Sequence, residues 1–218
     1  MLALSDTCTA AITGRGGLCA CLNATLLGRL RAVAGDVRLD AGEVLFAAGS
    51  PADALYGVRH GAVMLCAWVG AERRQILSFH FSGDMVGFTD GGRHHATAIA
   101  LGRASLCRIP ETEMDNDPAL RGHVMGILRR NLSQSLDMQV RLGRMSAAER
   151  VRALLTELHG RLGGGGELHL PMRIAEMADY LGLRPETVSR EMSALRQAGV
   201  VGAFTHDGML PILRPDGL

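Results

Sequence analysis

Lysine is absent from this chain of 218 residues, and all of its 23 basic residues are arginines. Acidic residues number 22, so the formal net charge is only +1. This balance excludes a broad polybasic coat, so any binding to nucleic acid must come from locally placed charges. Aromatic residues make up only 4% of the chain, which argues against an RNA-binding platform of stacked rings.

Long apolar runs are also absent. No uninterrupted segment approaches the about 20 residues that a membrane-spanning helix needs. The first residues, MLALSDTCTAAITGRGGLCACLNA, lack the basic start and the clean apolar stretch of a secretory signal. We therefore expect a cytoplasmic protein with no membrane partner. In that compartment the five cysteines favour ligand, redox or buried roles over a disulfide framework.

The first half of the chain changes character after a short helix. Residues 1–21 form a cysteine-containing segment without firm periodicity, and apolar residues at helical spacing predict a helix over residues 23–34. From residue 36 to 109, short apolar runs alternate with glycines. That pattern predicts many short strands joined by glycine turns, as in a β-sandwich or β-roll. We assign residues 22–115 to this first domain.

A single long helix is predicted next, within residues 117–146, with Pro118 at a favoured first-turn position. Its apolar residues form a stripe at helical spacing: Leu120, Val124, Leu128, Leu132, Leu136 or Met138, and Leu142. A lone helix of this length with such a stripe usually packs against a partner helix, which predicts a dimerisation helix. Packing of the stripe on the first domain alone is the alternative.

The last domain is predicted to span residues 147–218 and to begin with a capped helix. Ser146 and Glu149 match the S-x-x-E capping box that opens a helix. Four glycines at 163–166 break the helix and form a flexible linker. A short strand is predicted after them, at residues 168–170.

Two short amphipathic helices follow, separated by Gly182, with Pro185 where the second begins. Two short helices joined by a tight turn that contains glycine make a helix-turn-helix. Their buried stripes are expected to consist of Ile174, Met177, Ala178 and Leu181 in the first helix and Val188, Met192 and Leu195 in the second. Residues 200–213 are predicted to form a two-stranded wing with its tip at residues 206–208.

The second helix carries polar residues outside its apolar stripe, and they include Glu186, Thr187, Ser189 and Arg190. In a helix-turn-helix, the start of this helix enters the major groove of DNA. Arg190 can donate two hydrogen bonds to a guanine edge, and Glu186 can accept one from a cytosine amino group. These residues are therefore predicted to read bases. The alternative is a surface ion pair between Glu186 and Arg190, one helical turn apart.

The segment ADYLGLRPETVSREMSALRQAGVV closely resembles the signature of the FNR branch of the CRP/FNR superfamily of bacterial transcription regulators. Similarity extends upstream through GEVLFAAGSPADALYGVRHGAVML and SAAER. The resemblance implies an α+β fold, with an N-terminal double-stranded β-helix of the cyclic-nucleotide-binding type as the sensor, a long dimerisation helix and a C-terminal winged helix-turn-helix. It also implies a homodimer on double-stranded DNA, reading TTGAT half-sites of a palindrome through Glu186, Ser189 and Arg190. RNA polymerase is the further partner that the family implies.

The superfamily uses several signals, and cyclic AMP needs a Gly-Glu turn and an arginine clamp in the β-roll. The turn reads Gly83-Asp84 here, and the clamp positions fall at His94 and His95. No cyclic nucleotide is therefore expected. His94 and His95 are expected to be surface-loop histidines, with haem or metal ligation as the alternative.

The cysteines suggest another signal, because FNR-type oxygen sensors hold a [4Fe-4S] cluster with three N-terminal cysteines and one in the β-roll. Cys107 lies where the β-roll ligand falls, and a C-x2-C-x7-C spacing lands on Cys8, Ala11 and Cys19. Alanine at the middle position departs from the family, and Cys21 is the natural substitute. The resemblance thus implies an iron–sulfur cluster on Cys8, Cys19, Cys21 and Cys107, with oxygen or redox control.

Two alternatives remain for the signal: a regulator without a cluster, degenerate or controlled by thiol redox chemistry, and one that senses haem or nitric oxide in the β-roll. Cys66 is most simply a small buried hydrophobe, and that role is also the alternative for Cys107.

An enzyme is not expected. The chain has no dinucleotide-binding or Walker motif and no recognisable Ser/His/Asp frame. The glycines at 163–166 lack the Lys-Ser/Thr that a phosphate-binding loop requires. A protein-interaction module with a vestigial helix-turn-helix is the remaining class, and specific binding to a palindrome would distinguish a regulator from it.

Overall fold

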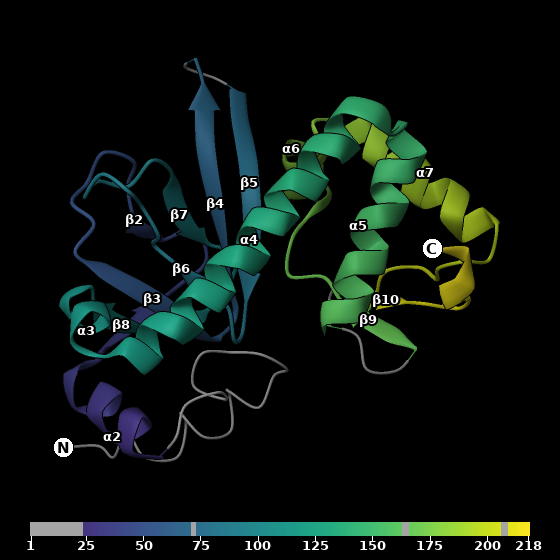
Figure 1. The fold of residues 1–218 in the computed structure, drawn as a ribbon. Coiled ribbons are helices and arrows are strands. Elements are labelled where there is room, and N and C mark those ends of the chain that lie inside the picture. The colour runs from purple at the N-terminus through teal and green to yellow at the C-terminus, as the bar shows by residue number, and fades with distance from the viewer. Residues whose placement is uncertain (1–23, 71–72, 163–165, 206–208) are drawn as a thin grey trace. The chain divides into compact units, whose positions relative to one another are not determined.

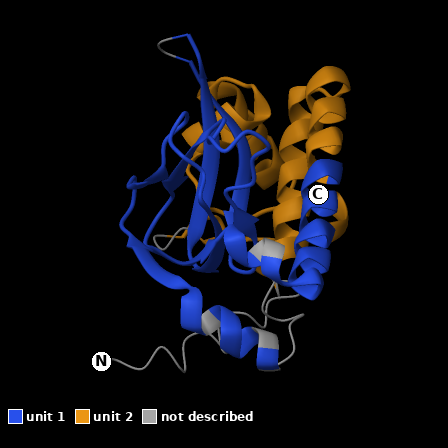
Figure 2. Ribbon diagram, turned by 60° about the vertical axis from the view of Figure 1, so that its left-hand side comes forward, with its two compact units in different colours: residues 1–133 blue, residues 134–218 orange. Residues whose placement is uncertain are grey.

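The computed structural model describes residues 24–70, 73–162, 166–205 and 209–218. The chain divides into two compact units, residues 1–133 and 134–218 (Figure 2). The cysteine-containing segment predicted at 1–21 lies outside the described residues.

The first unit is built on eight strands that pair antiparallel in two four-stranded sheets (Figure 1). One sheet has the order β1-β8-β3-β6 and the other β2-β7-β4-β5. The strands are β1 (Gly35–Leu39), β2 (Val44–Phe46), β3 (Ala54–His60), β4 (Ala62–Val69), β5 (Arg73–Phe81), β6 (Met85–Val86), β7 (Thr97–Ala100) and β8 (Ala104–Pro110). The predicted β-roll is confirmed.

Helices cover the outer side of the first sheet, where an apolar cluster forms. Helix α2 (Ala24–Val33) contributes Leu30, and α4 (Pro118–Arg144) contributes Leu120, Val124 and Ile127. They pack against three side chains of the sheet, Leu55, Met85 and Ile109. A short helix, α3 (Thr112–Asn116), precedes α4.

The long helix predicted after the β-roll is confirmed as α4, but its apolar stripe has two environments. Leu120 is 1% exposed and packs on the β-roll, whereas Leu132 is 61% exposed and Leu136 is 52% exposed. The first turns therefore pack on the first domain, as one alternative proposed. The later part of the stripe is exposed to solvent in the single chain.

The second unit holds the end of α4 and a winged helix-turn-helix. Its elements are α5 (Ala147–Leu162), β9 (Glu167–His169), α6 (Ile174–Leu181), α7 (Pro185–Gln197), β10 (Met209–Pro211) and a final 3-10 turn, η2 (Pro215–Gly217). The three helices α5, α6 and α7 bury apolar side chains that include Val151, Leu154, Leu155, Leu158, Met177, Leu181, Val188, Met192 and Leu195.

The predicted wing is present in a modified form. Strand β10 pairs antiparallel with β9 on one side. On its other side the chain is held by a bridge between Val201 and Ile212 and by a hydrogen bond of 2.8 Å from the Gly202 amide to the Pro211 carbonyl. The predicted tip at 206–208 lies outside the described residues. In the part of the chain that the structure covers, no helix has the length and apolar character needed to cross a membrane.

Candidate nucleic-acid interface

The helix-turn-helix forms because two apolar faces meet across a glycine turn. Gly182 ends α6 in the left-handed conformation, with φ 62° and ψ 38°, which side chains other than glycine rarely adopt. Pro185 then occupies the first turn of α7, where its missing amide hydrogen costs nothing. With the α7 stripe of Val188, Met192 and Leu195 buried, the opposite face of α7 is left to solvent.

The predicted base-reading residues lie in the first two turns of α7. Glu186, Ser189 and Arg190 are exposed, and Thr187 is half-buried beside them. Glu186, Ser189 and Arg190 are three and four positions apart and therefore share one face of the helix. This face offers a carboxylate, a hydroxyl and a guanidinium, the groups that recognise base edges in the major groove. Their role in reading DNA remains a prediction.

The alternative ion pair between Glu186 and Arg190 is not found among the described residues. The Nε of Arg190 instead lies 3.8 Å from an oxygen of Glu191, and the Arg190 side chain is 73% exposed. A pair at this distance with one partner so exposed contributes little to stability. The Arg190 guanidinium therefore stays available to a partner outside the chain.

Two arginines that the sequence reasoning did not single out stand at the helix starts. Arg173 precedes α6 and Arg184 precedes α7, and both are exposed. Neither is a favoured capping residue, and a positive charge at a helix N-terminus is unfavourable. A basic residue at both starts of a helix-turn-helix is the signal that could have found them. Arginines and helix N-termini are common contacts of DNA phosphates.

The start of helix α5 is fixed by the capping box predicted from the sequence. The amide of Ser146 donates to the carboxylate of Glu149 at 2.7 Å, and the Ser146 hydroxyl donates to the same oxygen at 2.7 Å. These hydrogen bonds hold the pKa of Glu149 below its usual range. Helix α5 therefore begins where the S-x-x-E motif places it.

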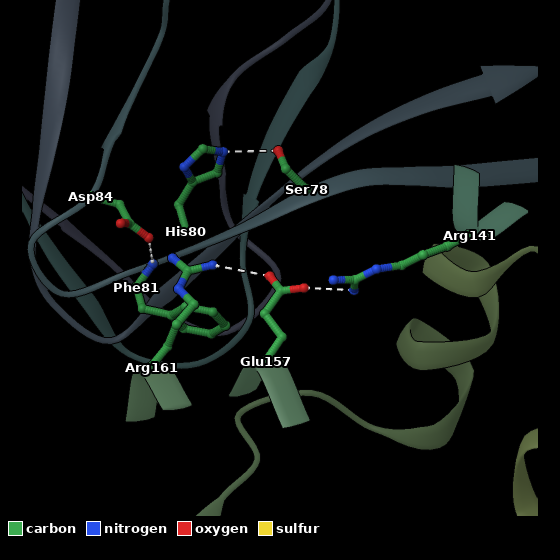
Figure 3. Close-up of polar contacts among 7 residues, drawn as sticks. All are labelled: Ser78, His80, Phe81, Asp84, Arg141, Glu157 and Arg161. Atoms are coloured by element: carbon green, nitrogen blue, oxygen red, sulfur yellow. Dashed lines mark hydrogen bonds and ion pairs between the residues drawn. The ribbon is translucent and has the colours of Figure 1, made fainter. Parts of the chain in front are cut away.

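An ion-pair group lies between α4 and α5 in the second unit (Figure 3). Glu157 accepts from Arg141 at 2.7 Å and lies 3.6 Å from Arg161. Burial and the charge of Glu157 raise the pKa of Tyr180 on α6 to about 12. The hydroxyl of Tyr180 therefore stays protonated at physiological pH.

The residues at the turn and clamp positions that a cyclic nucleotide would need take part in the structure of the β-roll itself. The carboxylate of Asp84 accepts a hydrogen bond of 2.8 Å from the Phe81 amide (Figure 3). His95 is exposed, as predicted, and lies 2.8 Å from Asp90. The absence of a bound cyclic nucleotide stays a prediction.

The expectation that His94 is a surface residue is wrong. Its ring is buried and stacks on Phe46, with centroids 3.6 Å apart and planes 11° from parallel. Its backbone also bonds to Gly49 and Ser50, which fixes the loop against the sheet. Burial holds the pKa of His94 below its usual range, so the ring is favoured in its neutral form.

Of the four predicted cluster ligands, only Cys107 falls within the described residues; Cys8, Cys19 and Cys21 lie outside them. Cys107 is half-buried on β8, where it pairs with Asp36 on one side and Gly57 on the other. A Cβ atom at Gly57 would come within 2.9 Å of the Cys107 sulfur, so a glycine makes room for this thiol.

Cys66 and Cys107, the two cysteines among the described residues, have different surroundings. Cys66 is fully buried, as predicted for a small core residue. Cys107 packs at the margin of the cluster that contains Leu30 of α2. In the described ranges, no group of three or more His, Cys, Asp or Glu residues is placed to hold a metal ion.

Comparison with known proteins gives matches over both units. The C-terminal residues 149–218 match the family model of the Crp-like helix-turn-helix domain, and residues 36–116 match that of the cyclic nucleotide-binding domain.

Curated relatives and a solved structure cover most of the chain. The nitrogen fixation regulation protein FixK of Bradyrhizobium diazoefficiens is 33% identical over 200 residues, which cover 88% of this chain and 84% of FixK. The transcriptional activator protein FnrA of Stutzerimonas stutzeri is 33% identical over 76% of this chain and 72% of its own. The structure of FixK2 from Bradyrhizobium japonicum superposes with a TM-score of 0.80 at 30% identity, over 85% of this chain and 96% of that one.

Proposed function

The chain belongs to the CRP/FNR family of DNA-binding transcription regulators, and we propose that it acts as a homodimer that reads a palindrome of the form TTGAT-N4-ATCAA. It is a regulator and not an enzyme. The observation that carries the proposal is the exposed face of α7, where Glu186, Ser189 and Arg190 lie together at the start of the second helix of the motif.

Base reading follows from the chemistry of this face. The TTGAT half-site contains one guanine, whose O6 and N7 atoms can accept both hydrogen bonds of an arginine fork such as Arg190. Glu186 can accept from a cytosine amino group, and Ser189 can donate or accept. The exposed arginines before α6 and α7, Arg173 and Arg184, supply charge for the phosphates that flank these bases.

Dimerisation is supported by the exposed apolar residues of α4. Met125, Leu132, Leu136 and Val140 are 46%, 61%, 52% and 59% exposed. Their spacings of seven and four residues place them on one face of the helix, away from the face that packs on the β-roll. Such a row on a long helix is the pattern of a helix–helix seam. A second copy on this seam gives the two-fold symmetry that a palindrome requires.

Titration of the purified protein with duplex DNA tests this function. We expect tight binding of TTGAT-N4-ATCAA with two chains per duplex, and much weaker binding of a scrambled duplex of the same composition. Specific binding should persist at salt concentrations that remove the scrambled duplex, because non-specific binding rests almost wholly on phosphate contacts. Equal affinity for the two duplexes at all salt concentrations would contradict the proposed function.

For the signal, we propose control by oxygen or redox state through a [4Fe-4S] cluster held by Cys8, Cys19, Cys21 and Cys107. When bound, such a cluster supplies an oxygen-sensitive group ligated by thiolates. Two features of the described residues support the assignment. Cys107 is only half-buried. Helix α2 begins at Ala24, three residues after Cys21, and its Leu30 packs in the apolar cluster that Cys107 borders.

Iron and sulfide analysis of anaerobically reconstituted protein tests this signal. We expect both in the wild type, with broad absorption near about 400 nm that air bleaches. Cys107→Ser should abolish the iron and sulfide content, whereas the matched control Cys66→Ser, at a core position, should retain it. A wild type without iron and sulfide would leave the cluster-free regulator as the function. A Cys107→Ser variant that carries as much iron as the wild type would contradict the ligand assignment. The state of the cluster would then control binding to DNA, and contact with RNA polymerase would pass this on to transcription.

A further inference from the structure

One arginine joins the end of the long helix to the helix-turn-helix. Arg150, in the first turns of α5, donates from Nε to the Met145 carbonyl at 3.0 Å and from Nη2 to the Leu142 carbonyl at 2.7 Å. Its Nη1 donates to the Leu181 carbonyl at 3.0 Å. Leu142 lies in the last turn of α4, Met145 follows the helix directly, and Leu181 is the last residue of α6.

The carbonyls of Leu142 and Leu181 belong to a class of acceptors that the helices themselves cannot satisfy. The last four carbonyls of an α-helix have no partner within the helix and need one from outside. A guanidinium presents several donors in a rigid plane, so a single side chain can serve two helix ends at once. Arg150 therefore acts as a shared cap for α4 and α6.

The turn of the motif lies directly against this cap. A Cβ atom at Gly182 would lie 3.4 Å from the Leu142 side chain and 3.8 Å from Nη1 of Arg150. The glycine that sets the angle between α6 and α7 is thus in contact with the end of α4. This contact is made directly through space, from the Leu142 side chain to the turn.

A second contact holds the same helix end on α5. Arg141, in the last turn of α4, pairs with Glu157 at 2.7 Å, and both side chains are about four-fifths buried, at 18% and 21% exposed (Figure 3). Buried Tyr180 of α6 feels the charges of Arg141 and Glu157. The end of α4, α5 and α6 therefore form one body.

We propose that Arg150 is a positioning residue that fixes the reading helix α7 relative to the dimer seam and so sets the spacing of half-sites that the dimer accepts. This role rests on the proposed dimer. Val140, the last residue of the seam, lies two positions before Leu142, whose carbonyl Arg150 binds. The path from the seam to α7 is therefore short: Val140, the Arg150 cap, the Gly182 turn, and then α7.

Half-site spacing is a sensitive readout of this path. One base pair of B-DNA changes the separation of half-sites by roughly 3.4 Å and also rotates one relative to the other. A dimer with a rigid path accepts one spacing, whereas a loosened path accepts several at lower affinity. Lysine at position 150 would keep the charge but could not reach three carbonyls with a fixed fork.

The experiment compares wild type, Arg150→Lys and the control Arg144→Ala on four duplexes. The duplexes are a single TTGAT half-site, the palindrome, and palindromes whose spacer is one base pair shorter or longer. Arg144 is an exposed arginine in the last turn of α4, and its side chain makes no hydrogen bond among the described residues. It therefore controls for the loss of a charge.

For Arg150→Lys we expect single half-site affinity within about twofold of wild type, because α7 itself is unchanged, and a loss of about tenfold or more on the palindrome. The preference for the correct spacer should flatten. Arg144→Ala should keep the spacer preference. Arg141→Ala, which breaks the second contact without touching the fork, should shift the spacer preference in the same direction by less.

Three results would overturn the role. A parallel loss of half-site and palindrome affinity in Arg150→Lys would make Arg150 a support of α7 alone. Both Arg150→Lys and Arg141→Ala could retain the wild-type spacer preference, which would remove any positioning effect. A wild type that binds single and paired half-sites equally would instead contradict the dimer itself, and this is visible before any variant is measured.

Discussion

The two units use their polar residues in opposite ways. In the winged helix, the residues that the motif marks for DNA, such as Arg190 and Glu186, stay exposed and take little part in the fold. In the β-roll, two residues at positions that a cyclic nucleotide would use serve the fold: Asp84, at the turn position, caps a turn, and His94, at a clamp position, stacks on Phe46. A sequence motif is therefore a more reliable guide to function where its polar side chains are not needed to stabilise the fold.

The largest expected effect is a loss of dimerisation through α4, where the fold of the single chain leaves apolar side chains exposed. Leu136→Asp places like charges opposite one another at the proposed seam, which should weaken dimerisation by several kcal/mol. Sedimentation at micromolar concentration should show a monomer, and the palindrome should lose its advantage over a single half-site. Thermal unfolding should change little, because Leu136 is 52% exposed.

Gln134→Asp is the matched control for this variant. Gln134 is exposed on the same helix, two positions before Leu136, and points to the opposite face. It should remain a dimer. A Leu136→Asp protein that sediments as the wild type does would show that the seam lies elsewhere.

A smaller effect is expected where a polar residue does serve the fold of the winged helix. Ser146→Ala removes the hydroxyl of the α5 capping box, which should lower the free energy of unfolding by about 1 kcal/mol. Chemical denaturation measures this change. DNA affinity of the folded fraction should be preserved, and a variant of unchanged stability would mean that the cap is not formed in solution.

The smallest expected effect concerns pH and the β-roll. Because burial lowers the pKa of His94 in the folded protein, the unfolded chain binds a proton more readily below about pH 6.5. Stability should therefore fall as the pH drops below that value towards the lower pKa of the folded state. His94→Phe keeps an aromatic ring against Phe46 and removes the titrating group, so its unfolding should depend less on pH.

Thermal unfolding between neutral and mildly acidic pH measures this difference. His60→Phe is the control, because His60 is exposed at the end of β3. If His94→Phe and wild type lose stability equally on acidification, the buried ring of His94 does not contribute to acid sensitivity.

Prediction from the sequence succeeded where the information is local. The helix-turn-helix is specified by the helical spacing of its apolar residues and by Gly182, all within one short stretch of sequence. Its two helices therefore lie where the pattern predicted them. The stripe of α4 is also local, but periodicity cannot tell what covers it. Leu120 and Leu132 look alike in the pattern, yet one is 1% and the other 61% exposed.

Prediction failed where the partner is distant in the sequence. His94 looked like a loop histidine, because its partner Phe46 is 48 residues away and only the folded sheet brings them together. The role of Arg150 was missed for the same reason. Its acceptors are backbone carbonyls, one of them 31 residues away, and a carbonyl leaves no mark in the residue pattern.

Whether α7 reads bases can be measured with a double-mutant cycle. Affinity is measured for wild type and Arg190→Ala on the TTGAT palindrome and on one with the guanine replaced, with Arg196→Ala of the same helix as control. We predict that the binding free energy weakens by about 1–3 kcal/mol per half-site when either the guanine or Arg190 is changed. Changing the second partner after the first should then weaken binding by almost nothing more. Arg196→Ala should keep the full preference for guanine. If Arg190→Ala still discriminates against the altered base as strongly as wild type does, α7 does not read this base through Arg190 and the account is contradicted.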